Sequence, residues 1–391
     1  MKDFRAEVIK NIPPSGIRAF FELVIGMEDV ISLGVGEPDF VTPWHICEAA
    51  IYSVEKGATS YTSNLGLLEL REKIADYLCR KFDVSYEPKK EILITVGASE
   101  AIDLAFRAIC NPGDEVIIFD PSYVAYVPIV TLAGGKPVVI SMVEGDDIIF
   151  DVNKVRENIT NNTKAIFINY PNNPTGKSFS RDELIQIAEV ADEFDLLVVS
   201  DEIYGELTYD YNHVSFPSLP GMKERTILIS GFSKAFAMTG WRIGYAAAPN
   251  YIIEAMMKIH QYSILCAPIA SQIAAVEALN RGEKDMRLMR KEYHKRRNVI
   301  VDGFNKIGLP CPHPEGAFYA FPSIKRLPFT SEEFCHTLLK EENVAVVPGT
   351  AFGKSGEGFI RCAYAASMEN IKAALTRIES FLKRRGLNVS G

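Results

Sequence analysis

Short apolar runs that are rich in β-branched residues recur along most of this chain, with helical patterns between them. Several runs are apolar throughout, as is typical of strands covered on both faces of a sheet. Alternation of such strands with helices predicts a layered α/β domain with a mostly parallel, seven-stranded sheet. The runs are Ile92–Val96, Val116–Phe119, Pro137–Ser141, Ala165–Asn169, Leu196–Ser200, Thr226–Ile229 and Tyr245–Ala248.

A change in the pattern of predicted helices and strands after Pro249 indicates a second, smaller domain. Before it, Arg181–Phe194 is a predicted helix with Ser180 as its N-cap. After it, two long helices are predicted at Tyr251–Leu279 and Lys284–Ile307, with a break near residues 280–282. The remaining predicted elements are strands at Ala317–Phe321, Ala345–Val347 and Phe359–Ala363 and helices at Ser331–Glu342 and Met368–Arg384. We therefore expect a large domain of residues 46–280 and a smaller α+β domain made of residues 1–45 and 281–391.

Composition narrows the class of protein. A length of 391 residues predicts about two or three domains, and a net charge of -8 argues against a general nucleic-acid binder. The cysteines form no Cys-x-x-Cys pair and the histidines no His-Glu-x-x-His pattern, so we expect reduced thiols in a cytoplasmic protein and no metal site. Charged residues within the first ten positions predict no signal peptide, and no apolar stretch is long enough to span a bilayer.

Lys234 follows the predicted strand Thr226–Ile229 in a turn of mostly small residues. This pattern places one amine at the mouth of a sheet, with Ser233 and Arg242 close in sequence. A partly desolvated amine is neutral enough to attack an aldehyde, and a serine beside an arginine suits a phosphate dianion. The alternative is a solvated lysine in a surface turn.

Two other predicted strand ends carry polar side chains. Asp201 follows Leu196–Ser200, at the edge where open α/β sheets bind ligands, and its carboxylate could hold a proton on a heteroaromatic nitrogen. Asn173 lies in the proline-containing turn Tyr170–Gly176 and offers an amide donor at the next strand mouth. The alternatives are a helix cap for Asp201 and a purely structural turn for Asn173.

A small-residue segment and an isolated arginine complete the set. Gly97-Ala98-Ser99 follows Ile92–Val96, so N–H groups at a helix start could approach an anion closely. Arg361 interrupts the apolar run Phe359–Ala363, and a buried guanidinium needs a partner such as a substrate carboxylate. The alternative for Arg361 is an edge strand with the charged group in solvent.

In this order the features resemble the class I/II aminotransferases, which are pyridoxal-phosphate enzymes of fold type I. The resemblance covers nearly the whole chain, from Gly34-Val35-Gly36-Glu37-Pro38-Asp39-Phe40 to Arg361. The motif around Lys234 matches the family almost residue for residue, through Met238-Thr239-Gly240-Trp241-Arg242. The chain is similar to the prokaryotic subgroup that contains aspartate and aromatic aminotransferases.

The resemblance implies a role for each site residue, with pyridoxal 5'-phosphate as the cofactor. Lys234 would bind the cofactor covalently and carry the proton at the substrate Cα, while Asp201 would pair with the ring nitrogen. Tyr204 and Asn173 would hydrogen-bond the phenolic oxygen, and Tyr123 would stack on the ring. The phosphate would be held by Ala98, Ser99, Ser233 and Arg242, and by Tyr61 from the other subunit of a homodimer with shared sites. The substrate α-carboxylate would be held by Arg361, Gly36 and Asn173.

The identity of the substrate depends on departures from the family pattern. Some similar bacterial aspartate aminotransferases carry a lysine where this chain has Ser99, and the loop of residues 12–17, which lines the side-chain pocket in the family, is apolar. These features favour aromatic or other neutral amino donors, with 2-oxoglutarate as acceptor in a ping-pong reaction. Arg18 could still supply a cation for a second carboxylate. The alternatives are an aspartate aminotransferase, a C–S β-lyase on the same scaffold, and a non-catalytic pyridoxal-phosphate-binding regulator.

Overall fold

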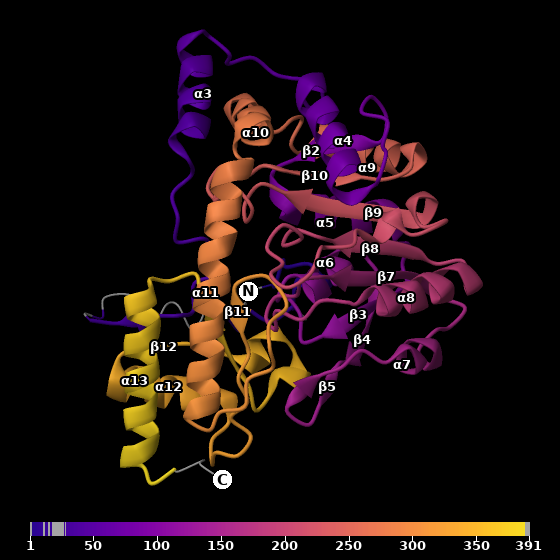
Figure 1. Cartoon of the computed structure of the whole chain (residues 1–391). Coiled ribbons are helices and arrows are strands. Elements are labelled where there is room, and N and C mark those ends of the chain that lie inside the picture. Colours follow the sequence, from indigo (N-terminus) through magenta and orange to yellow (C-terminus); the bar gives the residue numbers. More distant parts are fainter. Residues whose placement is uncertain (1, 11, 15, 18–26, 28, 388–391) are drawn as a thin grey trace.

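A seven-stranded sheet forms the centre of the larger part of the molecule (Figure 1). The chain is seen in a computed structural model that describes residues 2–10, 12–14, 16–17, 27 and 29–387. The strands are β2 Ile92–Thr95, β10 Gly244–Ala247, β9 Thr226–Gly231, β8 Leu197–Asp201, β7 Thr163–Asn169, β3 Glu115–Asp120 and β4 Lys136–Ser141, in that spatial order. In this sheet only β10 runs antiparallel to its neighbours. The predicted α/β class and mostly parallel sheet are confirmed.

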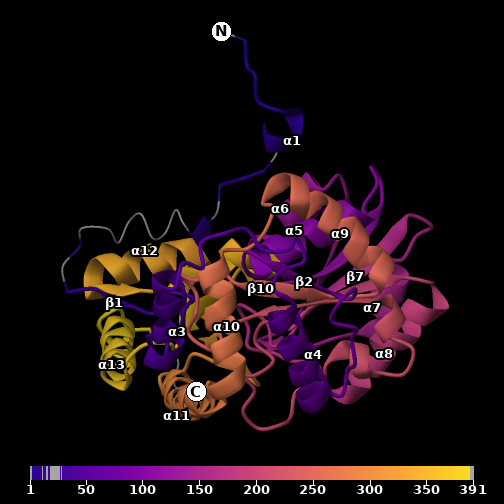
Figure 2. The ribbon, with the colours of Figure 1, turned by 90° about the horizontal axis from the view of Figure 1, so that it is seen from above.

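Helices cover both faces of this sheet, so strands such as β3 are buried along their whole length. The helices of this larger part are α3 Trp44–Glu55, α4 Leu68–Phe82, α5 Gly97–Ile109, α6 Tyr126–Leu132, α7 Val152–Glu157, α8 Arg181–Glu193, α9 Asn250–Ser263 and α10 Ile269–Arg281. Among them α3 packs on α10 and lies away from the sheet (Figure 1). Figure 2 shows α5, α6 and α9 on one face and α4 and α8 on the other. Helix α8 begins after Ser180 as predicted, and the Ser180 Oγ accepts a 3.2 Å hydrogen bond from the Glu183 N–H.

The last third of the chain builds a smaller α+β unit, at the lower left of Figure 1. Helices α11 Glu283–Lys306, α12 Ser331–Glu342 and α13 Met368–Arg384 pack around a sheet of order β11-β14-β13. Its strands are β11 Tyr319–Ala320, β13 Val347–Pro348 and β14 Ile360–Ala363, while β1 Ile31–Ser32 pairs in parallel with β12 Val344–Ala345. The other short elements are α1 Glu7–Lys10, β5 Val143–Glu144 and β6 Asp147–Ile148. Across the part of the chain that the structure describes, no helix is both long and apolar enough to cross a bilayer.

The prediction of one helix over Tyr251–Leu279 is wrong. The chain forms α9 and α10 separately, and Pro268 is the N-cap residue of α10. Leu265, between the two helices, has a φ of 75°, which a right-handed helix does not allow. Pro268 lacks an N–H to donate and disfavours helical backbone at the residue before it, so the first helix cannot continue into the second.

The predicted strand Ala345–Val347 is also different in the structure. Two separate strands replace it, because β12 pairs with β1 whereas β13 pairs with β14. The chain therefore changes its pairing partner at Val346, which lies between them. The predicted strand Ala317–Phe321 is shorter than expected and keeps only the two residues of β11.

Candidate active site

The carboxyl ends of several parallel strands meet at one edge of the large sheet. Strands β7, β8 and β9 are parallel neighbours, so the segments that carry Asn173, Asp201 and Lys234 leave the sheet on the same side. Antiparallel β10 begins at this edge, two residues after Arg242. A cavity of ≈ 530 Å³ opens there. It is lined by every predicted site residue except Tyr61: Gly36, Ala98, Ser99, Tyr123, Asn173, Asp201, Tyr204, Ser233, Lys234, Arg242 and Arg361.

Lys234 is half-buried and projects its amine into this cavity. The Nζ atom donates a 2.9 Å hydrogen bond to the carbonyl oxygen of Gly36. Burial is the main cause that lowers the pKa of Lys234 to about 8, and the positive charges of Arg361 and Arg242 lower it further. The half-buried position and the hydrogen bond to Gly36 exclude the alternative of a fully solvated turn lysine.

Asp201 is a buried carboxylate at the end of β8. Its Oδ2 accepts a 2.8 Å hydrogen bond from the Tyr126 hydroxyl, and its Oδ1 accepts one of 3.1 Å from the Ile203 N–H. Burial raises the pKa of Asp201 to about 6, although these hydrogen bonds and Lys234 oppose the rise. No helix begins at Asp201, so the helix-cap alternative is wrong, and no cation among the described residues forms an ion pair with it.

Two tyrosines that sequence reasoning missed support the site. Tyr126, the first residue of α6, contacts Asp201, and its ring meets that of Tyr123 edge-on. The Tyr319 hydroxyl lies 2.8 Å from that of Tyr204 and 3.3 Å from the Gly36 carbonyl oxygen, to which it donates. Tyr319 sits in the apolar run of β11, and nothing in that run distinguishes it from a core residue.

Arg361 is 1% exposed and lies on β14, the central strand of the small sheet. The edge-strand alternative is therefore wrong. Its Nη1 donates to Asn173 Oδ1 at 3.1 Å and its Nη2 to the Gly34 carbonyl oxygen at 2.5 Å, while the buried Nε has no partner. The ring of Tyr319 lies 4.7 Å from the guanidinium carbon. Among the described residues no carboxylate pairs with this cation, which leaves it available for an anionic ligand.

The start of α5 forms a concave backbone surface. Gly97 has a φ of 78°, and a Cβ there would lie 2.6 Å from Arg242 Nη2, so a side chain would fill the space in front of the helix. No side chain caps this helix start, which leaves the N–H groups of its first turn directed at the cavity lined by Ala98 and Ser99. The Arg242 charge and this helix terminus suit a phosphate dianion.

One predicted site residue lies away from the cavity. Tyr61 is 83% exposed and does not line it. Arg18, the predicted second cation, lies outside the described residues, as does Ser15 of the apolar loop. The rest of the cavity wall is mainly apolar and includes Ile17, Val35, Ile102, Val124 and Ile203 together with Glu37 and Thr239.

The residues present fit a ligand with three distinct groups. The uncapped helix start beside Arg242 fits a phosphate, the amine of Lys234 fits an aldehyde, and the buried Asp201 fits a protonated ring nitrogen. Arg361, with its unpartnered Nε, remains for a second molecule that bears a carboxylate. Pyridoxal phosphate and an amino acid together supply these four groups.

Comparisons with known proteins agree with this combination. Residues 28–378 match the family described as aminotransferase class I and II. A putative aminotransferase, YugH, of Bacillus subtilis is 54% identical and covers 98% of this chain and 100% of its own length. An aspartate aminotransferase of Pyrococcus abyssi is 46% identical over 96% of this chain and 97% of its own. The solved structure of an aromatic aminotransferase from Pyrococcus horikoshii superposes with a TM-score of 0.90 at 46% identity, covering 95% of this chain and 100% of that one.

Proposed function

Because the chain belongs to the aminotransferase class I and II family, we propose that it moves the amino group of an L-amino acid to 2-oxoglutarate in a ping-pong reaction. Members of this family depend on pyridoxal phosphate and share fold type I, and both statements hold for this chain. One observation carries the proposal: the unpaired, buried guanidinium of Arg361 shares a cavity with the amine of Lys234, whose pKa is lowered to about 8.

We assign cofactor binding to residues on both sides of the cavity. The first turn of α5, with Ala98 and Ser99, would hold the phosphate together with Ser233, Arg242 and a partner subunit's tyrosine. Tyr123 would stack on the ring. Asn173 uses its Oδ1 to accept from Arg361, so its NH₂ group is the part that can donate to the phenolic oxygen, beside the hydroxyl of Tyr204.

The proton chemistry follows from the burial of two groups. When bound, pyridoxal phosphate supplies an aldehyde that takes up the amino group and a ring that withdraws electrons from the substrate Cα. Lys234 would remove and return the Cα proton, since its lowered pKa keeps much of the amine neutral. Asp201 would keep a proton on the ring nitrogen. Arg361, helped by Gly36 and Asn173, would hold the α-carboxylate and orient Cα towards Lys234.

The charges in the cavity favour aromatic or neutral amino donors. The basic residues that line it within the described chain are Lys234, Arg242 and Arg361, and the proposal already gives each of them a partner. A distal carboxylate would meet apolar side chains such as Val35 and Val124. Aspartate is the second candidate, because the relative from Pyrococcus abyssi carries that name.

The visible absorbance of the cofactor-loaded protein tests this proposal. Single amino acids are added without a keto acid, and the initial rate at which the cofactor band bleaches ranks the donors. We expect phenylalanine or tyrosine to bleach the band faster than aspartate, and 2-oxoglutarate to restore it. Release of pyruvate and ammonia without any keto acid would instead indicate β-elimination, and an aspartate rate above all others would overturn the preference.

We also propose a homodimer in which Tyr61 completes the site of the partner subunit. Tyr61 lies on a segment that is held against the start of α10, because Gln272 Nε2 in the first turn of α10 donates to Thr62 Oγ1 at 3.1 Å. Exposed aromatic side chains surround this region: Trp44 and Tyr52 of α3, which packs on α10, and Tyr262. Light scattering should give twice the chain mass of 43.5 kDa, and a mass equal to one chain would contradict the dimer.

The division into domains and the compartment complete the proposal. Residues 46–280 would form the large domain, and residues 1–45 with 281–391 the small one. Support for the second group comes from the pairing of β1 with β12, which joins the two ends of the sequence. Structures with and without a substrate analogue should superpose within each group, and a rearrangement inside residues 46–280 would contradict the boundary. The free cysteines fit a reducing cytoplasm, which cell fractionation would test.

A further inference from the structure

Glu202, directly after Asp201, is a buried carboxylate that the reaction itself does not use. Its Oε1 accepts hydrogen bonds from the hydroxyls of Ser200 at 2.8 Å and Tyr170 at 3.1 Å and from the Phe216 N–H at 3.0 Å. Its Oε2 lies 2.7 Å from His213 Nε2. Both oxygens of this buried carboxylate therefore have hydrogen-bond partners.

His213, the partner of Glu202, is also buried and packed between aromatic rings. Its side chain is 2% exposed, and its ring stacks on Tyr170 with centroids 4.9 Å apart and meets Phe82 edge-on. The other ring nitrogen, Nδ1, is buried without a partner, so Glu202 is the hydrogen-bonding group that fixes this imidazole. The pair thus joins the end of β8 to the loop of residues 211–216 and to the turn that leads to Asn173.

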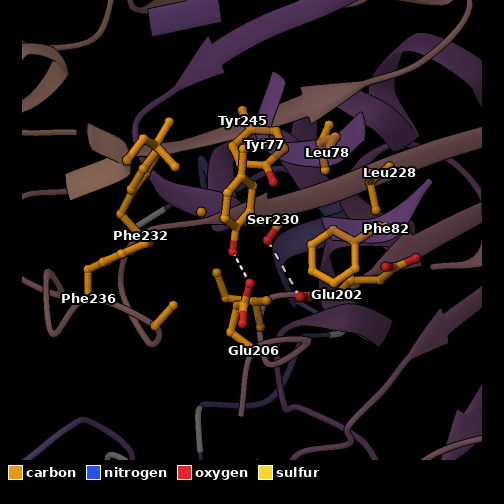
Figure 3. Close-up of a pocket in the computed structure, with 14 residues that line it drawn as sticks. Tyr77, Leu78, Phe82, Glu202, Glu206, Leu228, Ser230, Phe232, Phe236 and Tyr245 are labelled. Atoms are coloured by element: carbon orange, nitrogen blue, oxygen red, sulfur yellow. Dashed lines mark hydrogen bonds between the residues drawn. The ribbon is translucent and has the colours of Figure 1, made fainter. Parts of the chain in front are cut away.

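Glu202 and Asp201 share one peptide unit at the mouth of the cavity. The Asp201 carbonyl oxygen accepts from Asn169 Nδ2 at 3.1 Å, and the Glu202 carbonyl oxygen accepts from the Gly205 N–H at 2.9 Å. The backbone that aims the Asp201 carboxylate is therefore fixed on both sides. Figure 3 shows the space behind it, a cavity of only about 20 Å³, where the Ser230 hydroxyl is directed at the Glu202 carbonyl oxygen.

We propose that Glu202, anchored by His213, is a positioning residue that fixes the Asp201 carboxylate and strengthens the hold of that carboxylate on the proton of the cofactor ring nitrogen. This inference rests on the proposed role of Asp201. The negative charge of Glu202, on the residue that follows Asp201, is among the causes that raise the pKa of Asp201. A proton shared between Asp201 and a ring nitrogen is held more tightly in the field of that charge.

A purely structural role is the competing explanation. The titratable groups around Glu202 are His213, Tyr170, Tyr86 and Tyr245 and the Glu206 carboxylate of the same cavity, besides Asp201 itself. Burial raises the pKa of each of these tyrosines, so they stay neutral at working pH. Substitutions that remove either the charge of Glu202 or the packing around it separate the two explanations.

The test uses holoenzyme loaded with pyridoxal phosphate that carries nitrogen-15 in the ring, and follows the ring-nitrogen signal from pH 6 to 10 without substrate. Glu202→Gln removes the charge and keeps the shape. We expect it to lower the proton affinity of the ring nitrogen by about threefold or more, seen as proton loss at lower pH. The control is Tyr77→Phe, which removes a hydroxyl that donates to Glu206 in the same cavity (Figure 3). It should leave the ring-nitrogen signal unchanged.

Three outcomes decide the matter. If Asp201→Asn leaves the ring-nitrogen signal unchanged, the proposed role of Asp201 fails. If Asp201→Asn changes it while Glu202→Gln matches the native protein at every pH, the positioning role of Glu202 is overturned and the proposed function stands. Should Glu202→Gln not fold, His213→Gln replaces it: the amide keeps a donor for Glu202 and leaves its charge, so the proton affinity of the ring must not fall. A fall in that variant would overturn the inference.

Discussion

Asp201→Asn should stabilise the cofactor-free protein, and the gain should grow with pH. The pKa of Asp201 rises from an ordinary 3.8 to about 6, chiefly through burial. The folded state therefore binds this proton more tightly than the unfolded state, so its stabilising effect is complete below pH 3.8 and is lost as pH rises through 6. At pH 8 the ionised carboxylate costs the fold about 3 kcal/mol, since each pKa unit is worth about 1.4 kcal/mol.

Urea titrations of native and variant apoprotein at pH 5 and pH 8, at one protein concentration, measure this effect. The asparagine oxygen can accept from the Ile203 N–H, and its NH₂ group can donate to the Tyr126 hydroxyl oxygen, so the charge is the main difference. The stability gain should be larger at pH 8 than at pH 5 by about 1–1.5 kcal/mol. Asp302→Asn, which removes the same charge at an exposed position of α11, should show no such change. A gain for Asp201→Asn that stays constant or shrinks from pH 5 to pH 8 would refute the reasoning.

Three other substitutions test the assigned roles. Lys234→Ala should abolish multiple turnover while the cofactor still binds without a covalent link, as gel filtration and absorbance would show; native turnover rates in this variant would contradict the proton-transfer role. Arg361→Lys keeps a charge but loses the planar fork, so kcat/KM for α-amino acids should fall by about a hundredfold or more, and an unchanged value would mean that the carboxylate binds elsewhere. Mixing Lys234→Ala subunits with Tyr61→Ala subunits should restore part of the activity through hybrid dimers, and two inactive proteins that stay inactive after subunit exchange would speak against shared sites.

The large sheet could be predicted because its buried strands are apolar along most of their length. β3 and β8 are apolar runs flanked by turn residues, and a strand covered on both faces needs no particular partner to be recognised. The break between α9 and α10 was missed because apolar residues with helical spacing continue through it, although Pro268 marked it. The two-residue strands of the small sheet depend on pairing between distant segments, such as β1 with β12, and no local pattern encodes that pairing.

In the site, too, features that follow from the order of the strands could be predicted, and features that depend on long-range contacts could not. Asn173, Asp201 and Lys234 follow parallel strands, and such strands bring their carboxyl ends to one edge, so the cavity follows from the order of the chain. Tyr319 reaches the cavity because β11 of the small unit packs beside the Gly36 segment, which is a long-range contact. Tyr61 remains exposed in a single chain, and its proposed role requires a second subunit.

The site concentrates charges that the fold alone does not balance. Lys234 and Asp201 have pKa values moved towards their neutral forms by burial, and Arg361 keeps a buried Nε without a partner. Glu202, the residue after Asp201, is also buried, but both of its oxygens have hydrogen-bond partners, so burial alone does not leave a charged group without partners. Lys234, Asp201 and Arg361 match the groups that the proposed ligands carry. Lys234 matches an aldehyde, Asp201 a protonated ring nitrogen and Arg361 a carboxylate. Ligand binding would therefore remove electrostatic costs as well as add contacts. We expect the cofactor to stabilise the native protein much more than it stabilises the Asp201→Asn variant, in which the cost of the buried carboxylate is already absent.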